Sequence, residues 1–162
     1  MSPRFLEHLA LRPPGAPWYG STRVSPRLGD EDFCRALRAS GCVMLKLGLE
    51  SGDQGVLDAL EKGIRVNEAS RALRALKEAG IGTYVYLLFG TPAEDADAAE
   101  RTLAFTARHA GLIDYLNLAV FNLPAGSVEA GRLKMRPFYE GDLSLYADFE
   151  HPSGWGRREV RD

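Results

Sequence analysis

The chain has 162 residues, a length that suits one domain. Hydrophobic residues make up 45% of it, which is enough for a packed core and excludes an intrinsically disordered protein. The formal net charge of −2 excludes the basic excess that a nucleic-acid-binding surface needs. We therefore predict no nucleic-acid partner.

Targeting and membrane signals are not evident in the sequence. No apolar run approaches the length of about 18 residues that a membrane span needs. Residues 1–5 lack the charged-then-apolar layout of a signal peptide. We expect a cytoplasmic protein. The two cysteines, Cys34 and Cys42, do not form a disulfide framework.

Apolar runs alternate with amphipathic stretches along most of the chain. Strands are predicted over residues 17–24, 43–49, 84–89 and 115–123. Helices are predicted over residues 3–11, 30–40, 53–60, 67–79 and 93–110. We expect Asp30, Asp53 and Asn67 to cap three of these helices at their N-termini.

A strand followed by a helix, repeated roughly every 30 residues, is typical of βαβ units. The strands are apolar almost throughout, which predicts a parallel sheet covered on both faces and hence the α/β class. Four such strands are about half of a (β/α)8 barrel of about 250 residues. The chain is therefore either a small open sheet or part of a larger barrel. Residues 125–162 are rich in Gly and Pro and predict a loop-rich extension, with a helix beginning near residue 158.

Function in parallel α/β folds lies at the carboxyl ends of the strands. The residues at these predicted ends are Arg23, Glu50, Ser51, Gly90, Thr91, Pro92 and Asn122. Glu50 is the one carboxylate that directly ends a predicted strand. Polar side chains on one rim suit a polar small-molecule ligand, and neighbouring glycines let a backbone approach it closely.

Ordinary structural roles compete with this interpretation. Glu50 could bond the free amides of the next helix, and Ser51 is more typical of a helix cap than of a ligand. Lys62 before Gly63 is typical of a helix C-terminus. The Gly90-Thr91-Pro92 turn suits any strand-to-helix connection, and Arg23 could be a solvated loop charge.

No metal site is predicted from this chain. Cys34 and Cys42 do not have the spacing of a zinc or iron–sulfur site, and both are typical of small core residues. His8, His109 and His151 are far apart in sequence. The chain also lacks a Walker loop, a dinucleotide-binding glycine fingerprint and a nucleophile elbow.

Several short segments together resemble radical S-adenosylmethionine (radical SAM) enzymes. The segments are Ser40-Gly41-Cys42, Leu47-Gly48-Leu49-Glu50-Ser51-Gly52, Val56-Leu57, Lys62-Gly63, Leu76-Lys77-Glu78-Ala79-Gly80-Ile81 and Phe89-Gly90-Thr91-Pro92-Ala93-Glu94. The resemblance covers roughly residues 18–124. It is strongest to the branch with cobalamin-binding members, coproporphyrinogen dehydrogenase relatives and methylthiotransferases.

The resemblance implies a fold and a domain division. Residues 1–124 are expected to form the middle-to-C-terminal part of a partial TIM barrel, and residues 125–162 its extension. In the family, three cysteines after the first barrel strand hold a [4Fe–4S] cluster, and SAM bound to the cluster is cleaved to a radical.

The resemblance also implies binding roles for individual residues. Glu50, with Ser51 beside it, matches the strand end that reaches the SAM ribose. Lys62 matches the position that meets the SAM carboxylate. Arg23 would face the methionine moiety. Gly90, Thr91 and Pro92 match the next strand end, beside the nucleoside, and Asn122 the adenine or substrate end of the following strand.

The chain also departs from the family pattern. The cysteine loop and the first two barrel strands are absent, and Tyr86 stands where some relatives have an acidic residue. We therefore expect part of a radical SAM catalytic domain that is inactive alone and has a missing N-terminal barrel segment as a partner. Two alternatives are a non-catalytic α/β binding module on the same scaffold and an unrelated half-barrel enzyme with Glu50 as general base.

Overall fold

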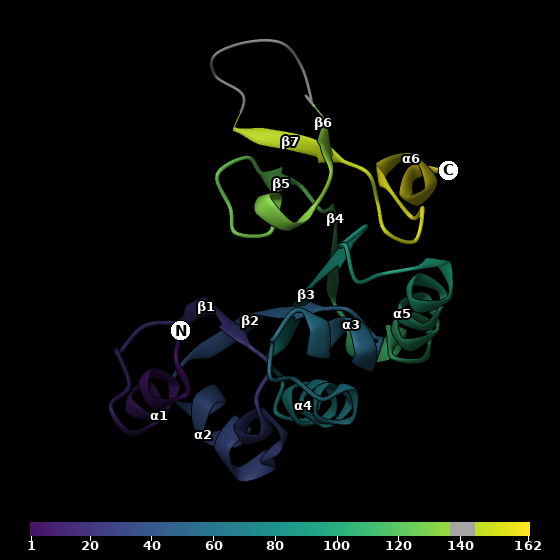
Figure 1. The fold of residues 1–162 in the computed structure, drawn as a ribbon. Coiled ribbons are helices and arrows are strands. Elements are labelled where there is room, and N and C mark those ends of the chain that lie inside the picture. Colours follow the sequence, from purple (N-terminus) through teal and green to yellow (C-terminus); the bar gives the residue numbers. More distant parts are fainter. Residues whose placement is uncertain (137–144) are drawn as a thin grey trace.

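The computed structural model describes residues 1–136 and 145–162 (Figure 1). Pro137 and Gly141, which belong to the predicted loop-rich extension, lie outside the described residues.

The main sheet is parallel and has four strands in the order β1-β2-β3-β4. The strands are β1 (Trp18–Arg23), β2 (Cys42–Glu50), β3 (Gly82–Phe89) and β4 (Tyr115–Val120). Strands that are neighbours in sequence are therefore neighbours in the sheet, as in one continuous arc of a barrel wall. The predicted α/β class with a parallel partial barrel is confirmed.

One helix precedes the main sheet and the others follow its strands. They are α1 (Pro3–Leu11), η1 (Pro26–Gly29), α2 (Glu31–Ala39), α3 (Gln54–Ala59), α4 (Val66–Glu78), α5 (Ala96–Arg108) and η2 (Ala110–Leu112). Asp30 and Asp53 cap α2 and α3 as predicted, accepting bonds from the amides of Phe33 at 3.1 Å and Val56 at 2.9 Å.

The prediction that Asn67 caps the fourth helix is wrong. The helix begins one residue earlier, at Val66, and its N-cap is Arg65. The amide of Val66 donates to the side-chain oxygen of Gln54 at 3.0 Å, and the amide of Arg65 donates to Glu68 at 3.4 Å. These side chains satisfy the first free amides, so no cap at Asn67 is needed.

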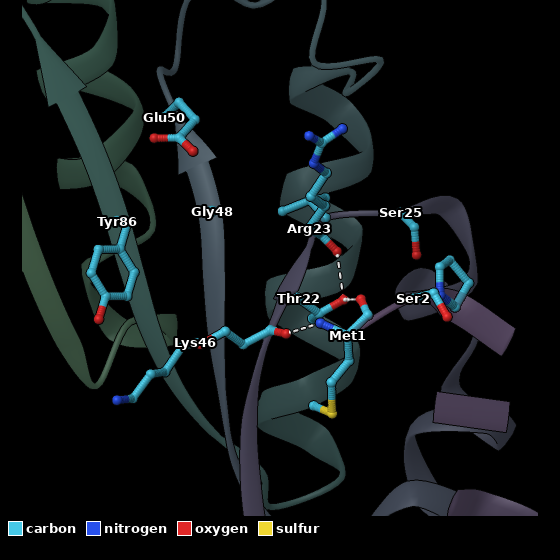
Figure 2. Close-up of a pocket in the computed structure, with 12 residues that line it drawn as sticks. Met1, Ser2, Thr22, Arg23, Ser25, Lys46, Gly48, Glu50 and Tyr86 are labelled. Atoms are coloured by element: carbon cyan, nitrogen blue, oxygen red, sulfur yellow. Dashed lines mark hydrogen bonds between the residues drawn. The ribbon is translucent and has the colours of Figure 1, made fainter. Parts of the chain in front are cut away.

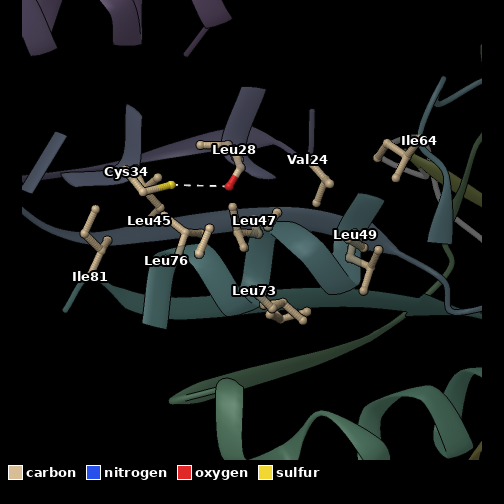
Figure 3. Close-up of a cluster of buried hydrophobic side chains, with 14 of the residues drawn as sticks. Val24, Leu28, Cys34, Leu45, Leu47, Leu49, Ile64, Leu73, Leu76 and Ile81 are labelled. Atoms are coloured by element: carbon tan, nitrogen blue, oxygen red, sulfur yellow. Dashed lines mark hydrogen bonds between the residues drawn. The ribbon is translucent and has the colours of Figure 1, made fainter. Parts of the chain in front are cut away.

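The hydrophobic core lies between the sheet and the helices of one face (Figures 1 and 3). Leu45, Leu47 and Leu49 of β2 are each at most 2% exposed and point toward Leu73 and Leu76 of α4. Burying one such side chain stabilises the fold by about 1.5–3 kcal/mol. The cysteines belong to the same core: Cys34 and Cys42 are fully buried, as the sequence predicted.

The expectation that both faces of the sheet are covered is wrong. Burial alternates along β2, where Met44, Lys46 and Gly48 stay partly exposed between the buried leucines. The helices in Figure 1 pack on the leucine face. Tyr19 is 65% exposed on the opposite face, which we call the open face. The sequence alone predicted a covered sheet because the open face also carries Met44, Gly48 and the tyrosines of β3. These residues make the strands resemble runs that are apolar on both faces.

The residues after β4 form a second, three-stranded sheet in the order β5-β7-β6. Its elements are β5 (Leu123–Pro124), η3 (Ala130–Arg132), β6 (Met135–Arg136) and β7 (Tyr146–Phe149), followed by α6 (Arg157–Arg161). The strand predicted over residues 115–123 is therefore two strands, because the chain leaves the main sheet after Phe121. The amide of that residue makes a last bond, at 2.8 Å, to the carbonyl of Phe89. The helix predicted near residue 158 is α6.

Across residues 1–136 and 145–162, no helix combines the length and the apolar character that crossing a membrane requires.

We predict that the 162-residue chain self-associates, because the sheet ends at β1 on one side and at β4 on the other and open edges invite pairing. On β4, Leu118 is 64% exposed and Leu116 is 41% exposed. Light scattering coupled to size exclusion should give a mass that falls on dilution. Leu118→Lys should shift the chain toward monomer, whereas Val128→Lys, in the second-sheet region, should not. A chain that is monomeric at every concentration would contradict this.

Candidate functional site

Glu50 ends β2 in an unusual backbone conformation. Its φ is 72°, in the left-handed region that glycine favours, and the pairing of β2 with β3 shifts register between Gly48 and Glu50. A non-glycine residue held in this region is strained, and such strain concentrates at functional sites. The irregularity turns the end of the strand and re-aims the carboxylate.

The carboxylate of Glu50 lies back over Gly48 (Figure 2). A Cβ on Gly48 would lie 3.2 Å from Oε1 of Glu50, closer than most real contacts. Lys62 holds the same oxygen, with its Nζ 3.2 Å away. Both side chains are about three-quarters buried, so this pair is less screened than a surface ion pair. Gly48 and Lys62 thus fix the carboxylate on the open face.

A hollow of about 680 Å³ lies beside this carboxylate. It is lined by Met1, Ser2, Pro3, Ser21, Thr22, Arg23, Val24, Ser25, Lys46, Gly48, Glu50 and Tyr86. We call it the Glu50 hollow. Figure 2 shows Arg23 and Glu50 at its upper rim, at the ends of neighbouring strands, with Tyr86 and Lys46 below them. Opposite charges, a phenol and small polar groups along one wall suit a polar ligand of small-molecule size.

The structure brings Arg23, Glu50 and Lys62 together but places Ser51 elsewhere. Ser51 is fully buried, and its hydroxyl lies 2.9 Å from the hydroxyl of Thr102 in α5. It also accepts a bond from the amide of Asp53 at 3.1 Å. Ser51 therefore ties the end of β2 to α5 and does not line the Glu50 hollow.

The turn after β3 and Asn122 contact the C-terminal segment. The carbonyl of Thr91 is 2.8 Å from the Nε2 of His151, and the side chain of Asn122 accepts a bond from Arg157. Gly90 has a φ of 73° and Pro92 is half-buried in the same turn. These strand-end residues are held by packing against the chain end and do not line the Glu50 hollow.

Glu94 is a buried carboxyl group that no sequence pattern indicated. Its residue is 1% exposed. Its Oε2 accepts bonds from the amide of Gly90 at 2.5 Å and the indole of Trp155 at 3.2 Å. Burial raises the pKa of Glu94, and these two donors oppose the shift without cancelling it. The Oε1 of Glu94 has no partner among the described residues, so hydrogen bonds compensate only part of the cost of burying this carboxyl group.

The cysteines do not fit an iron–sulfur cluster. Both residues are 0% exposed, so their Sγ atoms are closed to a cluster, and burial raises the pKa of the Cys34 thiol to about 11 and that of the Cys42 thiol to about 12. Both lie in the core on the helix side of the sheet. Within residues 1–136 and 145–162, no group of at least three His, Cys, Asp or Glu side chains could hold a metal ion.

Lys46 and Gly48 line the Glu50 hollow but were not predicted, and Tyr86 was noted only as a departure from the family. Their signal was present in the sequence: Lys46, Gly48 and Glu50 alternate with three leucines at the period of a half-buried strand. The run was interpreted as apolar throughout, so its polar face was missed.

A parallel α/β sheet with a ligand-sized hollow at the carboxyl end of its strands is typical of enzymes built on barrels or open sheets. The particular family follows from sequence comparison. Residues 10–106 match the radical SAM superfamily, and the chain belongs to that superfamily.

Curated relatives include an anaerobic magnesium-protoporphyrin IX monomethyl ester cyclase of Rubrivivax gelatinosus. It is 34% identical over 98 residues, which are 60% of this chain and 18% of the relative. An uncharacterized methyltransferase of Pyrococcus horikoshii is 26% identical over 56% of this chain and 19% of its own length. The chain therefore spans less than a fifth of the length of these relatives.

Solved structures share the fold. The radical SAM methyltransferase TsrM of Kitasatospora setae, with tryptophan substrate and a SAM analogue bound, superposes with a TM-score of 0.65 at 20% identity. The match covers 85% of this chain and 30% of TsrM. Coproporphyrinogen III oxidase (HemN) of Escherichia coli gives a TM-score of 0.57 at 23% identity, covering 83% of this chain and 29% of that one.

The buried Glu94 predicts a pH dependence of stability. Its pKa is raised in the folded chain, so its contribution is fully present below the ordinary carboxyl pKa and is lost as pH rises through the raised value. The free energy of unfolding, measured by urea denaturation, should therefore fall over this window. Glu94→Gln should flatten this part of the profile, and Glu78→Gln, on the exposed end of α4, should not. An unchanged profile in Glu94→Gln would contradict a raised pKa of Glu94.

Proposed function

We propose that this chain forms the SAM-facing wall of a radical SAM catalytic domain. The observation that carries the proposal is the placement of Glu50, strained at its strand end and held over Gly48 beside the Glu50 hollow. A carboxylate at the end of a barrel strand is well placed to accept hydrogen bonds from the two hydroxyls of a ribose.

The neighbouring side chains suit the rest of SAM. Arg23 stands beside Gly48 in the pairing of β1 with β2, and its guanidinium suits the carboxylate of the methionine moiety. Lys62 holds Glu50 in place, and Gly48 leaves room for the Glu50 carboxylate above the strand. We assign Ser51 and the turn at residues 90–92 the role of shaping the adjacent strand ends. We place Asn122 at the far rim of the SAM site.

In this superfamily the [4Fe–4S] cluster supplies the electron that cleaves SAM. The buried cysteines of this chain are unsuited to hold it, so we propose that its ligands come from a further barrel segment, in the same or another polypeptide. The present chain then binds and orients the nucleoside and is inactive alone.

A non-catalytic binding module is the second candidate function. The ion pair between Glu50 and Lys62 favours it, because the carboxylate already has a partner without any ligand. The two functions differ in one test: adding the cysteine-bearing segment of a relative should enable SAM cleavage by a catalytic wall but not by a binding module.

We predict that the chain binds SAM weakly and that binding depends on Glu50. Hydrogen bonds to a charged group contribute about 1.5–3 kcal/mol, so Glu50→Gln and Glu50→Ala should weaken binding by roughly 10- to 150-fold. Calorimetry measures this. The matched control Glu78→Gln, an exposed carboxylate on α4, should bind like the parent chain. Equal affinity in all these variants would show that Glu50 only pairs with Lys62.

A further inference from the structure

The hydroxyl of Thr102, a fully buried residue of α5, contacts the two residues that follow Glu50. Its Oγ1 lies 2.9 Å from the Oγ of Ser51 and accepts a bond from the amide of Gly52 at 3.0 Å. It also donates to the carbonyl of Ala98, one turn earlier in α5, at 3.0 Å. A hydroxyl has one proton and two lone pairs, so these three bonds use its whole capacity. With the proton directed to Ala98, both Ser51 and Gly52 donate to this oxygen.

Gly52 brings the chain after Glu50 into direct contact with α5. A Cβ on Gly52 would lie 2.7 Å from the Cβ of Phe105 and 2.9 Å from the Cα of Thr102, closer than real Cβ atoms come. Phe105 is 1% exposed and belongs to the hydrophobic core, where close packing leaves it little freedom to move aside. The backbone of Gly52 therefore rests on the helix at a fixed position.

An ion pair closes the same contact on its solvent side. The Nε of Arg101 in α5 is 2.5 Å from the Oδ2 of Asp53. Asp53 is also the N-cap of α3, the short helix that leads to Lys62, and Lys62 returns to the carboxylate of Glu50. The chain between the two partners of that ion pair thus starts from residues 51–53, which α5 holds in place.

We propose that Thr102 is a positioning residue for Glu50. Its hydroxyl holds residues 51 and 52 on α5 and thereby keeps Glu50 in the left-handed conformation that directs the carboxylate to the Glu50 hollow. A φ of 72° is unfavourable for a residue with a side chain, so it persists only where the surroundings impose it. The bonds to Thr102 begin at the next residue and act directly on this backbone. The inference deepens the proposed function, and it rests on that function only for its effect on SAM binding.

The test is an NMR measurement on the free 162-residue chain. A strong nuclear Overhauser effect between a residue's own amide and Hα protons marks a positive φ, because these protons are then closest. We expect this signal at Glu50 in the parent chain and in Thr102→Ser, which keeps the hydroxyl. Thr102→Val keeps the shape of the side chain but removes the three bonds, so the signal should be lost. Thr106→Val makes the same change one turn later, where the hydroxyl donates to the backbone of α5 at 2.8 Å, and should leave the signal unchanged.

Calorimetry with SAM gives a second readout. Thr102→Val should weaken SAM binding by about 5-fold, as expected for the loss of a hydrogen bond that maintains the site. Thr102→Ser and Thr106→Val should bind like the parent chain. In the Glu50→Gln background, Thr102→Val should have no further effect, because residues that act through one another are not additive. A Thr102 with a merely structural role would lower stability and leave both readouts unchanged.

Ser51→Ala is a milder variant that removes one of the bonds to Thr102 and should weaken the Glu50 signal. A Glu50 signal retained in Thr102→Val, or in Ser51→Ala should Thr102→Val not fold, would overturn the proposal. An unchanged SAM affinity in Thr102→Val would also overturn it. Absence of SAM binding in the parent chain would contradict the proposed function alone, and the Glu50 signal would still decide the role of Thr102.

Discussion

The alternation of side chains along β2 is the constraint on which the rest of the structure depends. Leu45, Leu47 and Leu49 are buried under the helices, so Lys46 and Gly48 must stand on the opposite face. The irregular end of the strand then turns the Glu50 carboxylate to the same hollow. A shift of one residue in the pairing would bury Lys46 and Glu50 and expose the three leucines. The packing of the core and the placement of the candidate site are thus consequences of one register.

The end of this strand departs from regularity in a way that serves the site. The bulge and the left-handed backbone at Glu50 cost conformational energy. The surroundings offset this cost. Ser51, the residue after Glu50, is hydrogen-bonded to Thr102, and Lys62 pairs with the Glu50 carboxylate. A group held this firmly needs little reordering when a ligand arrives, which favours binding.

The sequence predicted the elements better than the faces of the sheet. The cap at Asp53 and the apolar run of β2 have local causes, so they could be predicted from neighbouring residues. Which face of the sheet stays open depends on which face the helices pack against, and that is set by tertiary structure. Glu50 was found because it ends a strand. Glu94 was missed because its hydrogen-bond partner Trp155 is distant in sequence. Ser51 and Asn122 follow strand ends in the sequence, as Glu50 does. The side chain of Ser51 nevertheless contacts α5, and that of Asn122 contacts the C-terminal segment.

The central claim is that the carboxyl end of the open face is the SAM-facing surface. The most direct measurement is a two-dimensional amide NMR titration of the chain with SAM. The account predicts that shift changes concentrate on Arg23, Gly48, Glu50 and Tyr86, and that they are much smaller in Glu50→Gln. Changes confined to the helix-covered face, for example around α2 and α4, or spread evenly over the chain would contradict it.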